Sequence, residues 1–279
     1  MQWWCSATGE AWSWQWQAYP GVWLFALTTA ALYALAVRRI HGTNAAARPR
    51  WRRTGGWVGV VLVWVALDWP LGALGAGYLS SAHSTQFLLL AFIAPPLLLF
   101  GAGPVAVSDV APQRSRWLAP FLSPLTALIL FNVVVIATHM PRVVDSLMRA
   151  QLGAFAIDAA WVLSGLLFWK PVVLTRWPMH PLARIGYIFW GTIAHTGIGV
   201  WFLLADFPLY ALFELAPPIP GTDPMSDQQL AGGIMELVGM FIIFGAISLV
   251  ALRWMTEENR LEAENRDRLA GSGGSVPSA

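Results

Sequence analysis

The sequence predicts an all-α protein, a polytopic transmembrane bundle of about seven helices. Its composition and its long uncharged stretches carry this prediction. The 279 residues are 57% hydrophobic and 11% charged, whereas soluble domains carry roughly 25% charged residues. The 26 residues from His83 to Ser108 contain no Asp, Glu, Lys or Arg. About 20 apolar residues cross a bilayer as one helix, so this stretch alone is long enough to span it.

Seven apolar runs follow one another along the chain. We place the spans near 20–37, 57–76, 84–103, 119–138, 152–171, 183–204 and 229–252. Asp68-Trp69-Pro70 interrupts the second, so we expect its last turns to be irregular. Pro95-Pro96 is expected to kink the third, because proline has no backbone N–H, and neighbouring helices must then satisfy the freed carbonyls.

Basic residues lie almost entirely on one side of this arrangement. Fifteen of the 17 Lys and Arg fall in loops 38–56 and 104–118, in stretch 170–184 and after residue 252. Only Arg142 and Arg149 fall on the other side. The positive-inside rule therefore places the N-terminus outside and the C-terminus in the cytoplasm. The net charge of +2 is small, so we expect contact with the lipid bilayer and not with nucleic acid.

Two flanking segments complete the expected domain organisation. Residues 1–19 are expected to form an outer interfacial segment, and residues 20–254 form the transmembrane domain. Residues 255–279 are expected to form a charged cytoplasmic helix, with Glu262/Arg266 and Glu264/Arg268 spaced for ion pairs, and a disordered tail from residue 271. The aromatic residues that predict an interfacial belt in the first segment are Trp3, Trp4, Trp12, Trp14, Trp16 and Tyr19.

Five spans carry ionisable or metal-capable side chains near their outer ends. Asp158 and Glu236 have no Lys or Arg at their depth, so each must be protonated, hydrated, or paired with histidine or a cation. Gly191 and Gly199 share a helix face with His195, which predicts close approach by another helix. The candidate metal ligands are His83, His139, Met140, His195, Met235 and Glu236, and Asp158 is a supporting residue.

This set of residues leaves several chemistries open. Imidazole with thioether suits copper(I), whereas imidazole with carboxylate suits zinc, iron or copper(II). A proton relay through Asp158, His195 and Glu236 fits the same residues. A lone histidine is also often a hydrogen-bonded rim residue, and methionine is often only packing. The chain has no nucleotide-binding loop, nucleophile elbow or zinc-protease helix, and Cys5 is its one cysteine; we therefore expect no enzymatic activity.

Four motifs in order resemble one family, the CtaG-type (caa-type) cytochrome c oxidase assembly factors. They are SAHSTQFLLLAFIAPPLLLFG from Ser81, THMPRVVD from Thr138, GLLFWKPV from Gly165 and DQQLAGGIM from Asp227. The resemblance covers roughly residues 20–255. It implies a multi-pass protein of the bacterial cytoplasmic (inner) membrane that helps mature a haem–copper oxidase.

The resemblance also assigns residues and marks the chain as a divergent member. By position, the family's motif residues are His83, Gln86, His139, Asp227 and Gln228. Phe87 stands where the family has a second histidine, and Ser84 replaces a methionine. Glu236 stands where a tryptophan is expected.

Three hypotheses follow from the residues and the resemblance. The first is an assembly factor that supports copper-centre maturation of an oxidase through an outward-facing His/Met/carboxylate site. The second is an accessory structural subunit of a larger membrane complex with an eroded metal site. The third is proton or ion conduction through Asp158, His195 and Glu236.

Overall fold

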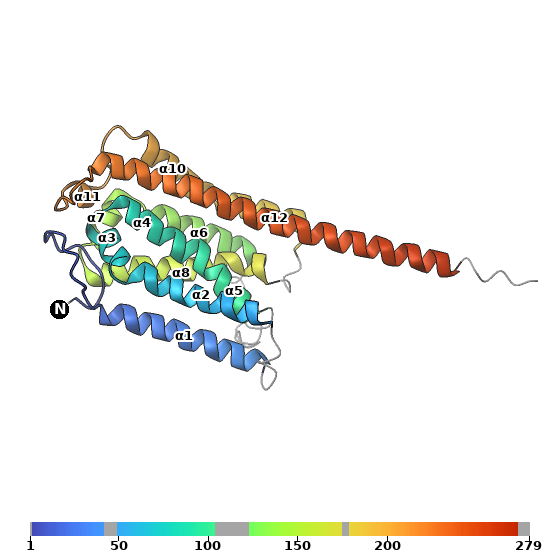
Figure 1. The fold of residues 1–279 in the computed structure, drawn as a ribbon. Helices are drawn as coiled ribbons and strands as arrows, with labels where there is room; N and C mark the ends of the chain where they lie inside the picture. Colours follow the sequence, from blue (N-terminus) through green and yellow to red (C-terminus); the bar gives the residue numbers. More distant parts are fainter. Residues whose placement is uncertain (1, 42–48, 104–122, 175–178, 273–279) are drawn as a thin grey trace, which may run out of the picture.

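The computed structural model describes residues 2–41, 49–103, 123–174 and 179–272, and this part of the chain is helical without strands. The helices lie side by side in one bundle (Figure 1). In chain order they are α1 (Pro20–His41), α2 (Arg50–Leu67), α3 (Leu71–Gly77), α4 (Ser80–Phe87), the π-helical turn η2 (Leu88–Ile93), α5 (Ala94–Ala102), α6 (Pro124–Thr138), α7 (Pro141–Leu147), α8 (Gln151–Val173), α9 (Pro181–Gly191), α10 (Ile193–Leu204), α11 (Ala211–Glu214) and α12 (Pro224–Ser272).

Five helical stretches are long and apolar enough to cross a membrane. Two further pairs, α2 with α3 and α6 with α7, pass the same test together but bend by 47° and 71°. Counting each bent pair as one span gives up to seven. The all-α membrane bundle is therefore confirmed, with the break at Asp68 as expected, because α2 ends at Leu67 and α3 begins at Leu71. The orientation in the membrane stays a prediction.

The third span, α4–η2–α5, lies at the centre and contacts α2, α8 and α12. Pro95 and Pro96 are at the start of α5, immediately after the π-helical turn. Pro95 lies four residues after Ala91 and has no N–H to donate to the Ala91 carbonyl oxygen. That oxygen instead accepts a hydrogen bond of 3.2 Å from the Trp169 indole of α8. The expected satisfaction of a freed carbonyl by a neighbouring helix is thus confirmed.

Glycines allow the neighbouring helices to approach this central span closely. A Cβ atom on Gly165 of α8 would lie 2.6 Å from the Ala91 carbonyl oxygen, and one on Gly59 of α2 would lie 3.1 Å from that of Ala94. Such contacts are tighter than side chains normally make. Since lipid gives helices little hydrophobic reason to associate, close backbone packing of this kind is a main source of cohesion.

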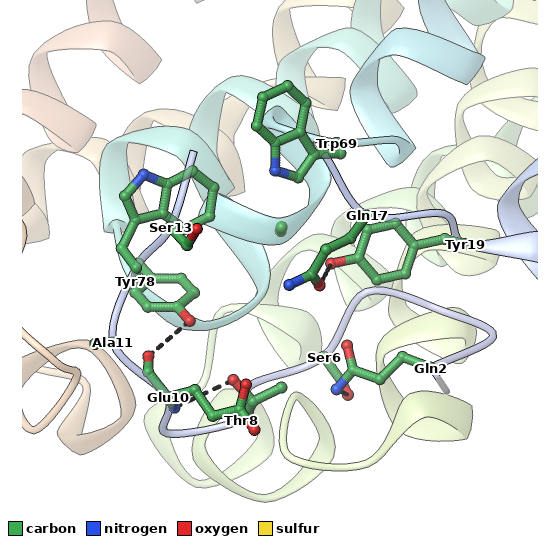
Figure 2. Close-up of a pocket in the computed structure, with 12 residues that line it drawn as sticks. Gln2, Ser6, Thr8, Glu10, Ala11, Ser13, Gln17, Tyr19, Trp69 and Tyr78 are labelled. Carbon is green, nitrogen blue, oxygen red and sulfur yellow. Dashed lines mark hydrogen bonds between the residues drawn. The ribbon is translucent and has the colours of Figure 1, made fainter. Parts of the chain in front are cut away.

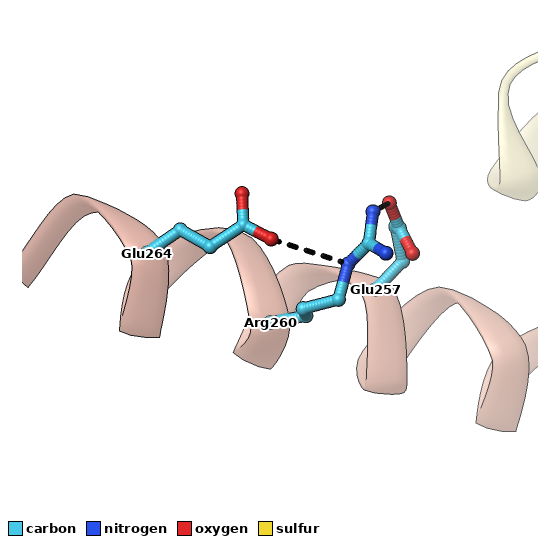
Figure 3. A network of polar contacts seen from close by, with 3 residues as sticks. All are labelled: Glu257, Arg260 and Glu264. Carbon is cyan, nitrogen blue, oxygen red and sulfur yellow. Dashed lines mark hydrogen bonds and ion pairs between the residues drawn. The ribbon is translucent and has the colours of Figure 1, made fainter. Parts of the chain in front are cut away.

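The last helix, α12, is 49 residues long and projects well beyond the rest of the bundle (Figure 1). At about 1.5 Å per residue it is roughly 73 Å long, more than twice a hydrocarbon core of about 30 Å. The predicted charged extension is therefore helical, and the helix continues two residues into the tail predicted to be disordered. The expected pairs Glu262/Arg266 and Glu264/Arg268 are not formed in this described helix. Arg260 instead pairs with Glu257 at 2.8 Å and with Glu264 at 3.7 Å (Figure 3), because its side chain reaches a carboxylate on either side.

Replacing Gly165 with alanine should destabilise the bundle. The new methyl group must push Ala91 away, and overpacking typically costs about 1–3 kcal/mol. The matched control is Gly197→Ala on α10, where an added Cβ meets nothing within 4 Å and alanine favours the helix by about 1 kcal/mol. Thermal unfolding in detergent is the measurement; equal midpoints for the two variants would contradict the packing described here.

Candidate functional site

Three histidines gather around Phe87 inside the bundle. His83 comes from α4, His139 ends α6 and His195 comes from α10, and none is more than 1% exposed. The ring centroids of His83 and His139 are 6.1 Å apart. The Phe87 ring lies 4.6 Å from His139 and 5.9 Å from His195. Phe87 thus packs against both His139 and His195.

The first two imidazoles are held in the same way. His83 Nδ1 is 3.1 Å from the Gly75 carbonyl oxygen, and His139 Nδ1 is 2.8 Å from that of Val135. Trp161 packs against both rings, at 5.0 and 5.8 Å. Since a carbonyl only accepts, each Nδ1 must carry the proton. Each Nε2 is then a bare lone pair, and both Nε2 atoms are buried without a hydrogen-bond partner.

His195 lies between α10 and α12. A Cβ on Gly239 of α12 would overlap the His195 ring, and one on Gly199 would overlap the Glu236 carboxylate. The predicted close approach at the glycine face, with His195 inside the bundle, is therefore confirmed. Neither ring nitrogen makes a hydrogen bond of standard geometry, although the backbone of Met235 lies near enough to interact with the ring.

The remaining candidate ligands are less closely gathered. Met235 is fully buried, whereas Met140 is 38% exposed. Glu236 is partly buried, with Oε1 lacking a partner. Among the residues that the structure describes, no three His, Cys, Asp or Glu side chains are arranged to hold a metal ion. The cluster thus offers imidazoles in close pairs and not a complete ligand set.

Asp158 belongs to a different environment, that of the N-terminal segment. Its Oδ2 accepts a 2.8 Å hydrogen bond from the Trp4 indole, and its Oδ1 has no partner. The expectation that Trp4 belongs to an interfacial belt is wrong, because this hydrogen bond draws its indole inside, to 1% exposure. Trp14 and Trp16 are largely exposed, as such a belt requires. The described side chains form no continuous hydrogen-bonded relay from Asp158 to His195 and Glu236.

Asp227 and Gln228 tie α12 to the rest of the site. Asp227 Oδ2 accepts from the backbone N–H of Ser80 at 2.6 Å and of Ser81 at 3.3 Å, and Oδ1 accepts from the Ser81 hydroxyl. A carboxylate from another helix therefore caps the N-terminus of α4, which positions His83. Gln228 Oε1 accepts from the Leu209 N–H at 2.6 Å, which fixes the loop after α10.

Several residues that hold the site are absent from the sequence-based prediction. Tyr210 donates its hydroxyl hydrogen bond to the His139 carbonyl at 2.8 Å, and Trp161 donates to the Thr138 hydroxyl at 2.8 Å. At Gly75 an added Cβ would overlap the Gln86 side-chain oxygen, so this glycine makes room for Gln86 beside His83. Trp161 lies one helical turn from Asp158, so the two side chains share a helix face. This spacing could have identified Trp161 as a residue of the site.

Replacing Asp227 with alanine should loosen the start of α4. It leaves buried backbone N–H groups of Ser80 and Ser81 without partners, which costs about 1–3 kcal/mol for such a group. The control is Asp206→Ala, which removes an exposed carboxylate from the loop after α10. Hydrogen exchange at α4 and thermal unfolding measure the effect; unchanged exchange in Asp227→Ala would contradict the cap.

Comparison with known proteins places the whole bundle in one family. The family model described as cytochrome c oxidase caa3 assembly factor (Caa3_CtaG) matches residues 31–257, which is most of the chain. No curated protein and no solved structure shows a significant match. The matched region contains all three clustered histidines, Asp227 and Gln228. The chain belongs to the caa3-type cytochrome c oxidase assembly factor family.

Proposed function

We propose that the protein supports copper-centre maturation in a haem–copper oxidase by holding copper at His83 and His139. In this role it catalyses no chemical step of its own. The observation that carries the proposal is the pair of Nε2 lone pairs, both buried and both without a hydrogen-bond partner. Burying such an atom unpaired is unfavourable, and a metal ion is one partner that relieves the cost.

The chemistry of the surroundings favours copper(I) as the cargo. Imidazole and thioether donors suit this soft ion, and Met235, whose backbone lies near the His195 ring, supplies a buried thioether in this part of the bundle. Metal–imidazole bonds are about 2.0–2.1 Å, so two imidazoles facing each other across an ion have ring centres roughly 6 Å apart. The spacing of 6.1 Å between His83 and His139 is compatible with a shared ion. His195, Met235, Glu236 and Met140 are the further donors in this proposal.

The proposed setting is the bacterial cytoplasmic membrane, with the histidine cluster toward the outer side. The distribution of Lys and Arg supports this orientation, with the N-terminus outside and the projecting end of α12 in the cytoplasm. The family match supports a haem–copper oxidase as the partner. Copper passed from the cluster to an oxidase subunit would then be delivered on the side where α4 begins.

Copper binding should depend on the histidine pair and improve when Phe87 is replaced by histidine. His83→Ala and His139→Ala each remove one of the two nitrogens, so we expect binding to fall at least about tenfold, or 1.4 kcal/mol. Phe87→His places a second imidazole one helical turn from His83 and should raise the affinity. The measurement is competition for copper(I) with a chromogenic chelator, using purified protein in detergent.

The control for this experiment is His180→Ala. His180 lies at the start of α9, where its Nδ1 accepts from the Leu182 N–H at 3.3 Å, away from the cluster. It should bind copper as the unchanged protein does. If neither the natural sequence nor Phe87→His binds copper(I), the copper proposal is wrong.

Phe87 favours one alternative, an accessory structural subunit of a larger membrane complex. An apolar ring that cannot bind a metal packs directly against both His139 and His195. A subunit of this kind uses the bundle for contacts and needs no metal.

Oxidase maturation in cells separates the two roles. For a copper-handling factor, His83→Ala combined with His139→Ala should leave the protein in the membrane but lower the copper content of the oxidase. For a structural subunit, the same double variant should leave copper content unchanged and co-purify with its complex in fixed stoichiometry. Metal analysis of the isolated oxidase and quantitative pull-down are the measurements.

A further inference from the structure

A cavity lies between the N-terminal segment and the ends of α1, α2 and α3. Figure 2 shows its lining side chains arranged around an open centre. The cavity has a volume of about 280 Å³. Most of its lining comes from residues 2–19, which precede the region matched by the family model. None of the clustered histidines lines this cavity.

The walls combine aromatic rings with neutral polar groups. Trp12 and Trp69 are nearly parallel, at 7°, with ring centroids 6.5 Å apart, and Tyr78 packs edge-on against Trp12 at 5.1 Å. Hydroxyl and amide side chains, among them Ser6 and Gln17, complete the lining. Aromatic π faces attract cations, more strongly where water is partly excluded.

Glu10 gives the cavity its charge. Among the lining side chains it is the one with a formal negative charge, and none of them is Lys, Arg or His. Burial raises the pKa of Tyr19, so that phenol is neutral. The Glu10 backbone is held in place, since its N–H donates to the Thr8 hydroxyl at 3.2 Å and its carbonyl accepts from the Tyr78 hydroxyl at 2.8 Å. The cavity is thus electronegative and fixed in shape.

One residue of the lining, Trp12, has a hydrogen-bond donor without an acceptor among the described residues. The Trp12 indole N–H is buried and has no hydrogen-bond partner in the described part of the chain. A bare cation cannot satisfy it, because a cation offers no lone pair. An occupant with both a positive charge and a nearby oxygen meets the needs of Glu10 and Trp12 together.

The position of the cavity points to a source for such a group. Tyr19 directly precedes α1 and Trp69 follows α2, so the cavity lies where these two spans end. Trp23, Leu24 and Leu27 on the first turns of α1 are 40%, 67% and 67% exposed. In a membrane these side chains face lipid, and a phospholipid packed along them has its headgroup at the level of the cavity.

We propose that this cavity binds an organic ammonium group with an adjacent oxygen acceptor, of the kind found in an amine-bearing phospholipid headgroup or a free amino alcohol. The ammonium group lies against the Trp12 and Trp69 rings and pairs with Glu10. The oxygen accepts from the Trp12 indole. No covalent step is involved.

The test compares two lipids with the same acyl chains. Purified full-length protein in detergent is titrated with 1-palmitoyl-2-oleoyl phosphatidylethanolamine or phosphatidylglycerol, and bound lipid is counted by native mass spectrometry. Preference for the ethanolamine lipid is expected. Glu10 is exposed, so in Glu10→Gln the preference should fall by up to about fivefold, the upper end for an exposed ion pair. Glu257→Gln, the same change on the projecting end of α12, should keep it.

Further measurements distinguish a lipid headgroup from a free amine as the source of the ammonium group and check that each variant folds. Saturable binding of free ethanolamine that Glu10→Gln abolishes, without a lipid preference, supports a free amine as the ligand. Trp12→Phe keeps a ring but removes the N–H from which the oxygen of either ligand accepts, and should weaken the binding of both the ethanolamine lipid and free ethanolamine. Circular dichroism and thermal unfolding verify that each variant is folded. The proposal is overturned if the two lipids bind equally and free ethanolamine does not bind saturably, if Glu10→Gln changes neither the lipid preference nor the binding of ethanolamine, or if methyl glucoside binds in place of the amine.

Discussion

The hydrogen bond from the Trp169 indole to the Ala91 carbonyl allows a proline-interrupted helix to occupy the centre of a membrane bundle. Hydrocarbon offers no water to a carbonyl that has lost its helical donor. Without the indole, the carbonyl freed by Pro95 would be stranded in the central span that contacts α2, α8 and α12. The glycine at position 165 brings α8 near enough for this contact. The close approach of α8 and the hydrogen bond to the Ala91 carbonyl therefore depend on each other. Gly165 allows the approach, and Trp169 of the same helix makes the hydrogen bond.

The interruption of this central span also affects the position of the histidine cluster. The π-helical turn at Leu88–Ile93 begins immediately after Phe87, and such turns re-aim the side chains around them. From the other end of α4, the Asp227 carboxylate fixes the first turn. His83 and Phe87 thus project from a short helix that is fixed at both ends, so the gap between His83 and His139 is set by the backbone and is not left to side-chain rotation.

Much of the fold could be predicted from the sequence because the bilayer imposes simple rules on composition. Apolar length predicted the position of most helices to within a few residues, although α2 begins at Arg50 and not near residue 57, and Pro95 and Asp68 marked interruptions. The faces of the helices were harder to predict. Hydrophobic periodicity carries little information in a span that is apolar all round, so nothing in the sequence placed Phe87 against both His139 and His195. Trp4 was misassigned for a related reason: its role depends on Asp158, which lies 154 residues away along the chain.

The continuous helix α12 runs along the bundle and on beyond it as a single element. The same helix carries Asp227 at the cap of α4, Met235 with its backbone near the His195 ring, and Arg260 far out on the projecting end. Backbone hydrogen bonds run through it without a proline or a break, so a twist applied at one end is carried along its axis. The cap of α4 and the neighbourhood of His195 therefore share one continuous helix with the segment that projects beyond the bundle.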